Sequence, residues 1–167
     1  MIDRKTDIIR ANIKIIGFGN IYMSDDGIGI HVIKELEKLQ YFEDFELIDG
    51  GTSGIDLIFH LQNSNKVILI DAVDAGQDIG EIILINPDNV KEFITGKGKS
   101  YSLHSFDLSE VLKLTKKLGL NKKLTIIGVK PENIGFGQSL SPVIKKKIHH
   151  IITVIKKETG SWHQEKK

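Results

Sequence analysis

The stretch NIKIIGFGNIYMSDDGIGIHVIKEL, residues 12–36, decides the fold that we expect for this chain. It begins with the apolar run 13–16, continues through a glycine-rich turn at 17–20, and then carries two adjacent carboxylates, Asp25 and Asp26. An amphipathic segment with apolar residues at helical spacing follows. This order predicts a buried strand, a tight turn and a helix whose first turn is acidic.

A glycine-rich turn between a strand and a helix is typical of nucleotide sites, but its details argue against one here. The dinucleotide fingerprint needs glycine at the first, third and sixth positions of the turn. Gly17 and Gly19 fit, whereas Tyr22 occupies the sixth position. The helix start, which would bind a pyrophosphate, carries Asp25 and Asp26, and these carboxylates would repel it. They suit a cation instead, or they stabilise the start of the helix.

The composition is that of an ordinary globular protein and excludes several kinds of site. The chain has 167 residues, 40% of them hydrophobic and 27% charged, and a net charge of +1. This length suits one domain over 1–167, and the charge does not favour nucleic acid. Because cysteine is absent, a metal would need oxygen and imidazole ligands. We find no apolar run near the roughly 20 residues of a membrane span and no signal-peptide core, so we expect a cytoplasmic protein.

Beyond this stretch, apolar runs and amphipathic segments alternate along the chain. The strands that we expect lie at 12–17, 45–49, 66–71, 81–85 and 124–129. The helices that we expect lie at 26–39, 55–61, 87–94, 107–118 and from 141 onward. The ends of the chain, 1–11 and 160–167, lack such a pattern and are expected to be loose.

The spacing of the third and fourth strands predicts the direction of the fourth. Only nine residues, 72–80, separate them. A parallel crossover needs about a dozen residues or more, so the fourth strand is predicted to run antiparallel to the others. The expected fold class is therefore α/β: a three-layer α/β/α sandwich with a five-stranded, mostly parallel mixed sheet.

The carboxyl ends of the first and third strands are the expected place for a site. In open α/β sheets, ligands bind beyond the strand ends where the strand order reverses. If the third strand lies beside the first, opposite the second, then Asp26 and Asp71 face the same crevice. Of the six histidines, His104 precedes a predicted helix and is the candidate third ligand, with His31 in reserve. Two carboxylates and one imidazole leave open coordination positions, which suits nickel or zinc and admits a ligand from a substrate.

Each of these residues also has a purely structural interpretation. Asp25 is expected to be a helix N-cap, and Asp26 alone would be a first-turn acid that matches the helix dipole. Asp71 is equally compatible with a turn at a strand end, and His104 alone with a solvated or capping histidine. The glycine-rich loop 50–54 is equally compatible with a plain tight turn. No single residue is specific for a metal site.

Together, the motifs resemble the nickel–iron hydrogenase maturation endopeptidases. The pattern Gly-x-Gly-Asn, then Asp-Asp-Gly-x-Gly at a helix start, matches the opening motif of that family. The loop 49–52 and the segments 128–132 and 139–143 also match, and the resemblance covers nearly all of 12–155.

The resemblance implies specific roles for residues of this sequence. It implies metal ligands at Asp26, Asp71 and His104. We also expect Gly50, Gly51 and Thr52, in the matching loop, to contact the substrate.

The resemblance implies an endopeptidase that removes a C-terminal extension from the precursor of a nickel–iron hydrogenase large subunit. Nickel supplied by the loaded precursor would be the recognition signal, and zinc or cadmium is expected to fit the same site in vitro.

The sequence lacks the His-Glu-x-x-His and Gly-x-Ser-x-Gly motifs. Hydrolysis would then use a metal-polarised carbonyl or water, or a carboxylate base. Asp71 is the preferred base, a role not separable from metal ligation. A protease with a single substrate needs no dimer, so a monomer is expected.

Two other classes of function stay open at this point. A nickel checkpoint protein or chaperone would bind the same precursor without cutting it. A hydrolase of this architecture with a small substrate would need a deep, enclosed pocket rather than an open cleft.

Overall fold

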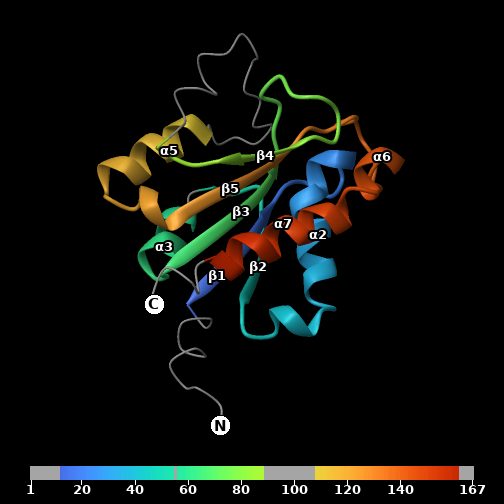
Figure 1. The fold of residues 1–167 in the computed structure, drawn as a ribbon. Helices are drawn as coiled ribbons and strands as arrows, with labels where there is room; N and C mark the ends of the chain where they lie inside the picture. Colours follow the sequence, from blue (N-terminus) through green and yellow to red (C-terminus); the bar gives the residue numbers. More distant parts are fainter. Residues whose placement is uncertain (1–11, 55, 89–107, 162–167) are drawn as a thin grey trace.

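A five-stranded sheet forms the centre of the computed structural model, which describes residues 12–54, 56–88 and 108–161. The strands are β1 (Ile13–Phe18), β2 (Glu46–Gly51), β3 (Lys66–Ala72), β4 (Ile82–Ile85) and β5 (Leu124–Val129). Their order across the sheet is β2-β1-β3-β5-β4 (Figure 1). All neighbours pair in parallel except β4, which is antiparallel to β5. The predicted mixed sheet with a reversed fourth strand is confirmed.

Helices cover both faces of this sheet, as Figure 1 shows. The long helices are α2 (Ile28–Leu36) and α7 (Ile148–Ser161) on one face, and α3 (Asp56–Gln62) and α5 (Leu108–Lys117) on the other. Every residue of β1 is buried, as expected for a central parallel strand. Ile13 and Ile15 pack in the core beneath α2 and α7, whereas Ile16 and Phe18 belong to the core beneath α3. This alternation confirms the three-layer α/β/α prediction.

The first helix differs from its prediction at both ends. A 3-10 turn, η1 (Ser24–Gly27), precedes α2, which ends at Leu36 rather than at residue 39. A second 3-10 turn, η2 (Gln40–Phe42), follows it. Ser24 has a φ of 51°, a left-handed conformation that non-glycine residues rarely adopt. The turn thus buries both Asp25 and Asp26, which a regular amphipathic helix start would leave in solvent.

The C-terminal helical segment also differs from its prediction. It is divided into α6 (Pro142–Lys145) and α7, and α7 continues through residues 160–161, which were expected to be loose. Thr159 explains this extension because its side chain is fully buried and its hydroxyl lies 3.2 Å from the hydroxyl of Tyr41. The predicted helix at 87–94 is described only at residues 87–88, which form a turn; its remainder lies outside the described residues.

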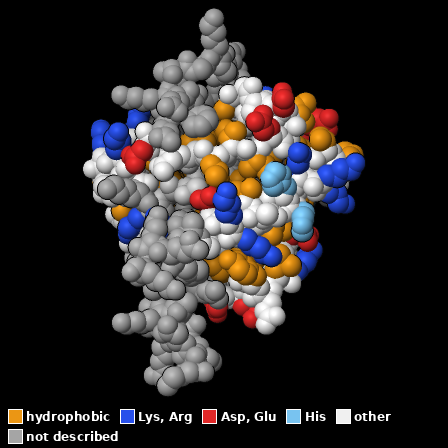
Figure 2. All heavy atoms as spheres, viewed as in Figure 1, with side chains coloured by type: hydrophobic (Ala, Val, Ile, Leu, Met, Phe, Trp, Pro, Cys, Tyr) orange, Lys and Arg blue, Asp and Glu red, His pale blue; other side chains and the backbone are white. Residues whose placement is uncertain are grey.

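On the face that Figure 2 shows, the described residues form no large region of one charge. Basic, acidic and apolar side chains are interspersed there, in agreement with the net charge of +1. None of the helices in the described segments is long and apolar enough to cross a membrane.

The first turn of α2 lies directly against the strand backbones at Gly29. A Cβ atom at this position would overlap the carbonyl oxygens of Phe18 and Ile70, the latter on β3. Gly17 has the reciprocal restriction, because its Cβ would overlap the carbonyl oxygen of Gly29. These glycines let the start of α2 approach the ends of β1 and β3 without a gap.

We expect Gly29→Ala to lower the free energy of unfolding by about 3 kcal/mol, because backbone oxygens cannot rotate away from the added methyl group. Urea denaturation followed by circular dichroism measures this change. The matched control is Gly160→Ala in α7, where an added Cβ meets no atom within 4 Å. That substitution should be neutral or stabilise by up to about 1 kcal/mol. Equal stability of Gly29→Ala and wild type would contradict the close approach.

Candidate functional site

The carboxyl ends of β1 and β3 lie side by side in the sheet. Their parallel register runs from Ile13 opposite Lys66 to Gly17 opposite Ile70, and β2 lies on the other side of β1. This is the strand order on which the predicted crevice depends. The turn η1, which follows β1, contacts β3, so the segment after one strand covers the end of the other. The structure therefore brings Asp26 and Asp71 to the same edge of the sheet.

Asp26 is a buried carboxylate held by the glycine-rich turn. Its side chain lies in η1, and the residue is only 3% exposed. The backbone N–H of Asn20 donates to its Oδ2 over 2.9 Å. The side chain therefore folds back over the turn instead of extending into solvent, as a simple first-turn acid would.

Asp71 is a buried carboxylate at the end of β3, opposite Gly128 of β5. It is 3% exposed, and its Oδ1 accepts a 2.8 Å hydrogen bond from the N–H of Ala72. Since Ile70 and Ala72 belong to the core beneath α2 and α7, alternation along the strand directs Asp71 to the opposite face.

The loop after β3 is tied to the end of β5 close to this position. Lys130 forms an ion pair with Asp74. The hydrogen bond from Lys130 lowers the pKa of Asp74 below its ordinary value. The backbone N–H of Val73 also donates to the carbonyl of Val129. Together these contacts fix the residues that follow Asp71.

The third expected ligand, His104, lies outside the described residues. Among the residues that the structure describes, no three His, Asp or Glu side chains lie close enough together to hold a metal ion. The assignment of Asp26, Asp71 and His104 as ligands therefore stays a prediction.

The prediction that Asp25 is a helix N-cap is wrong. Asp25 is fully buried, and its carboxylate accepts hydrogen bonds from the N–H groups of Glu132, Asn133 and Ser141 and from the Ser141 hydroxyl. These four bonds measure 2.7 to 3.0 Å. They hold the segment 132–141 against η1, and four donors to one carboxylate outweigh a single capping bond. The sequence carried no local signal for this contact, because the partners lie more than 100 positions away.

The loop expected to contact substrate lies next to the glycine-rich turn. The N–H of Gly19 donates to the carbonyl oxygen of Gly51 over 2.8 Å. Gly51 has a φ of 55°, a left-handed conformation that favours glycine, and Thr52 after it is exposed. Gly50 packs against Ile16 and the carbonyl of Gly17. The loop is thus positioned at the same edge as Asp26, and its contact with a substrate stays a prediction.

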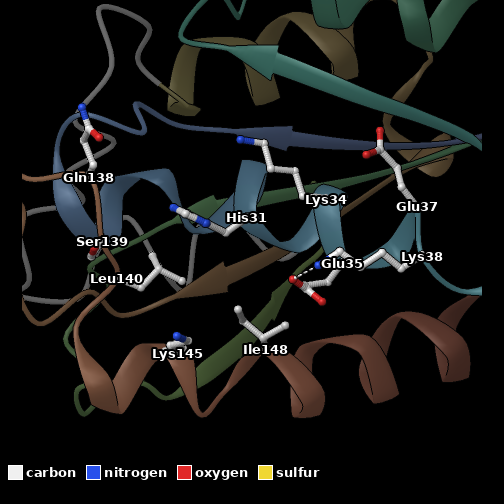
Figure 3. A pocket seen from close by; sticks show the side chains of 10 residues that line it. All are labelled: His31, Lys34, Glu35, Glu37, Lys38, Gln138, Ser139, Leu140, Lys145 and Ile148. Carbon is white, nitrogen blue, oxygen red and sulfur yellow. Dashed lines mark hydrogen bonds and ion pairs between the residues drawn. The ribbon is translucent and has the colours of Figure 1, made fainter.

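The reserve candidate, His31, lines a different pocket. Figure 3 shows its side chain extending from α2 toward residues 138–140, with Lys145 and Ile148 across the cavity. This cavity has a volume of about 640 Å³, and neither Asp26 nor Asp71 lines it. Burial lowers the pKa of His31, and the neighbouring Lys34 lowers it further, which favours the neutral imidazole. The structure therefore separates His31 from the two carboxylates.

We expect Asp25→Asn to lower the free energy of unfolding by about 2 to 3 kcal/mol. Asparagine carries no charge, and its NH2 group would face backbone N–H groups that need an acceptor. Hydrogen exchange in residues 132–141 should accelerate, which mass spectrometry of peptide fragments detects. The control is Glu81→Gln, an exposed carboxylate that accepts one bond from the N–H of Asp78. Unchanged exchange in Asp25→Asn would show that other contacts hold this segment.

Comparisons with known proteins identify the family. The model of a family described as hydrogenase maturation protease matches residues 30–158. The hydrogenase expression/formation protein HoxM of Azotobacter vinelandii is 35% identical over 146 residues, which cover 86% of this chain and 70% of that protein. The hydrogenase 2 maturation protease of Escherichia coli K12 is 31% identical over 139 residues, or 81% and 83% of the two chains.

A solved structure extends this likeness to three dimensions. The hydrogenase maturating endopeptidase HybD from Escherichia coli superposes with a TM-score of 0.69 at 29% identity. The superposition covers 89% of this chain and 94% of that one. The chain therefore belongs to the hydrogenase maturation protease family and is a peptidase.

Proposed function

We propose that this peptidase removes a C-terminal extension from the precursor of a nickel–iron hydrogenase large subunit once nickel has been loaded. The observation that supports the proposal is the pair of buried carboxylates, Asp26 and Asp71, which reach one edge of the sheet from different elements. Carboxylate oxygens are ligands that divalent metals accept, and a metal carried by the substrate would meet both carboxylates at this end of the sheet.

The donor set fits a metal that another protein already holds. Asp26, Asp71 and His104 would provide two oxygens and one imidazole nitrogen, which leaves positions for ligands from the precursor. The bonds from the N–H groups of Asn20 and Ala72 fix one oxygen of each carboxylate, which orients the side chains before the substrate binds.

The residues of this chain then have distinct tasks in hydrolysis. Nickel in the precursor would polarise the scissile carbonyl or a water molecule when it is bound. Asp26 and His104 orient the precursor relative to the crevice. Asp71 accepts a proton from the attacking water and passes it to the nitrogen of the leaving peptide. The loop at Gly50, Gly51 and Thr52 contacts the chain to be cut.

Mass spectrometry of a nickel-loaded large-subunit precursor incubated with this protein tests the proposal. We expect the C-terminal peptide to be released from the loaded precursor and to remain attached in a nickel-free control. Release of the peptide from both precursors would show that cleavage does not require nickel. A complex without release would identify a checkpoint protein instead.

Substitution of the proposed ligands separates a role in the reaction from a role in folding. We expect Asp26→Ala, Asp71→Ala and His104→Ala each to slow peptide release by at least about 100-fold, as loss of a ligand or general base does. Circular dichroism should show a folded protein in each case. The matched control is His149→Ala, an exposed position on α7 that should retain full activity. Unfolding of the Asp26 and Asp71 variants would favour their structural interpretation.

A further inference from the structure

Three apolar side chains are exposed near the start of η1 and form what we call the patch. It consists of Tyr22, Ile134 and Phe136, and Phe136 is 92% exposed. Tyr22 is 55% exposed and Ile134 is 36% exposed. Phe136 in particular gains almost no burial on folding, and neighbouring exposed apolar side chains mark interaction sites.

Hydrogen bonds fix the residues on both sides of Phe136. The N–H of Gly137 donates to the carbonyl of Tyr22 over 3.0 Å, and its carbonyl accepts from the N–H of Ser24 over 2.8 Å. The Ser24 hydroxyl donates to the carbonyl of Gly135 over 2.9 Å. Both neighbours of Phe136 are therefore bonded to the segment that leads into η1. The backbone on either side of Phe136 is therefore held in a fixed position.

The four bonds to Asp25 hold the two ends of the segment 132–141 as well. Gly137 packs so closely that a Cβ atom there would lie 2.7 Å from the hydroxyl oxygen of Ser24. Because this segment is already held in one conformation, binding a partner through it costs little conformational entropy. The patch is thus preorganised for contact with another molecule.

The patch flanks the segment that leads into η1, the turn that carries Asp26. Tyr22 lies four positions before Asp26, and the residues between them form the turn that buries this carboxylate. Figure 1 shows the chain after β5 passing beside the first turn of α2 before it reaches α6. A protein substrate bound over η1 would therefore lie next to this patch.

We propose that Tyr22, Ile134 and Phe136 dock the large-subunit precursor, with the Phe136 ring inserted into an apolar pocket of that protein. This inference rests on the proposed function, because it takes its occupant from the substrate of the same site. A peptidase that acts on one folded protein gains affinity from surfaces outside the scissile bond, and a few central aromatic residues supply most of it.

Kinetics of precursor cleavage by Phe136→Ser test the proposal. We expect KM to rise by about 10- to 100-fold, the usual effect of removing a central aromatic anchor, while kcat stays within twofold. The matched control is Phe59→Ser on α3, because Phe59 is 62% exposed but lies on the opposite face of the sheet. Its KM should equal that of wild type. Circular dichroism and urea denaturation verify that both variants are folded.

Three other outcomes would overturn the proposal. An unchanged KM in Phe136→Ser, with wild type active, would show that the precursor does not use the patch. Loss of self-association in Phe136→Ser, measured by sedimentation of the protein alone, would assign the patch to a second copy of this chain. If wild type neither binds nor cleaves the nickel-loaded precursor, in calorimetry and mass spectrometry respectively, the proposed function fails and this inference fails with it.

Discussion

The buried carboxylate of Asp25 joins two parts of the chain that are far apart in sequence, and the surroundings of the crevice depend on this contact. A carboxylate without exposure is costly unless hydrogen bonds replace its water. Here three backbone N–H groups and one hydroxyl do so. Because η1 is fixed to the segment 132–141 in this way, the neighbouring Asp26 has a defined position, and so does the surface formed by Tyr22, Ile134 and Phe136.

Two adjacent aspartates thus have different surroundings. In a 3-10 turn, successive side chains project about 120° apart, because three residues complete one turn. Asp25 faces the segment 132–141, whereas Asp26 faces the glycine-rich turn through Asn20. Of these two neighbouring carboxylates, Asp25 stabilises the fold by binding the segment 132–141. Only the second is left beside the ends of β1 and β3.

The features that were predictable from sequence are those that depend on local pattern. The apolar runs, the glycine-rich turn and the short connection at 72–80 led to the positions of the strands and to the reversed β4. The position of the third strand beside the first was an assumption, which the observed order confirms. The role of Asp25 was missed because its partners are distant in sequence, and the last turn of α7 was missed because it depends on Tyr41. The ligand set with His104 rests on family resemblance, since no local pattern distinguishes a ligand from a capping histidine.

The parallel pairing of β3 with β5 has a consequence for how this fold tolerates change. Val67 lies opposite Leu124, so the pairing closes a loop of the chain that contains β4 and α5. The entropy of closing such a loop grows only with the logarithm of its length, and doubling it costs about 0.6 kcal/mol. Lengthening the connection between Ile85 and Leu108 is therefore expected to cost the sheet little stability. Its sequence is more restricted than its length, because His104, the expected third metal ligand, lies within it.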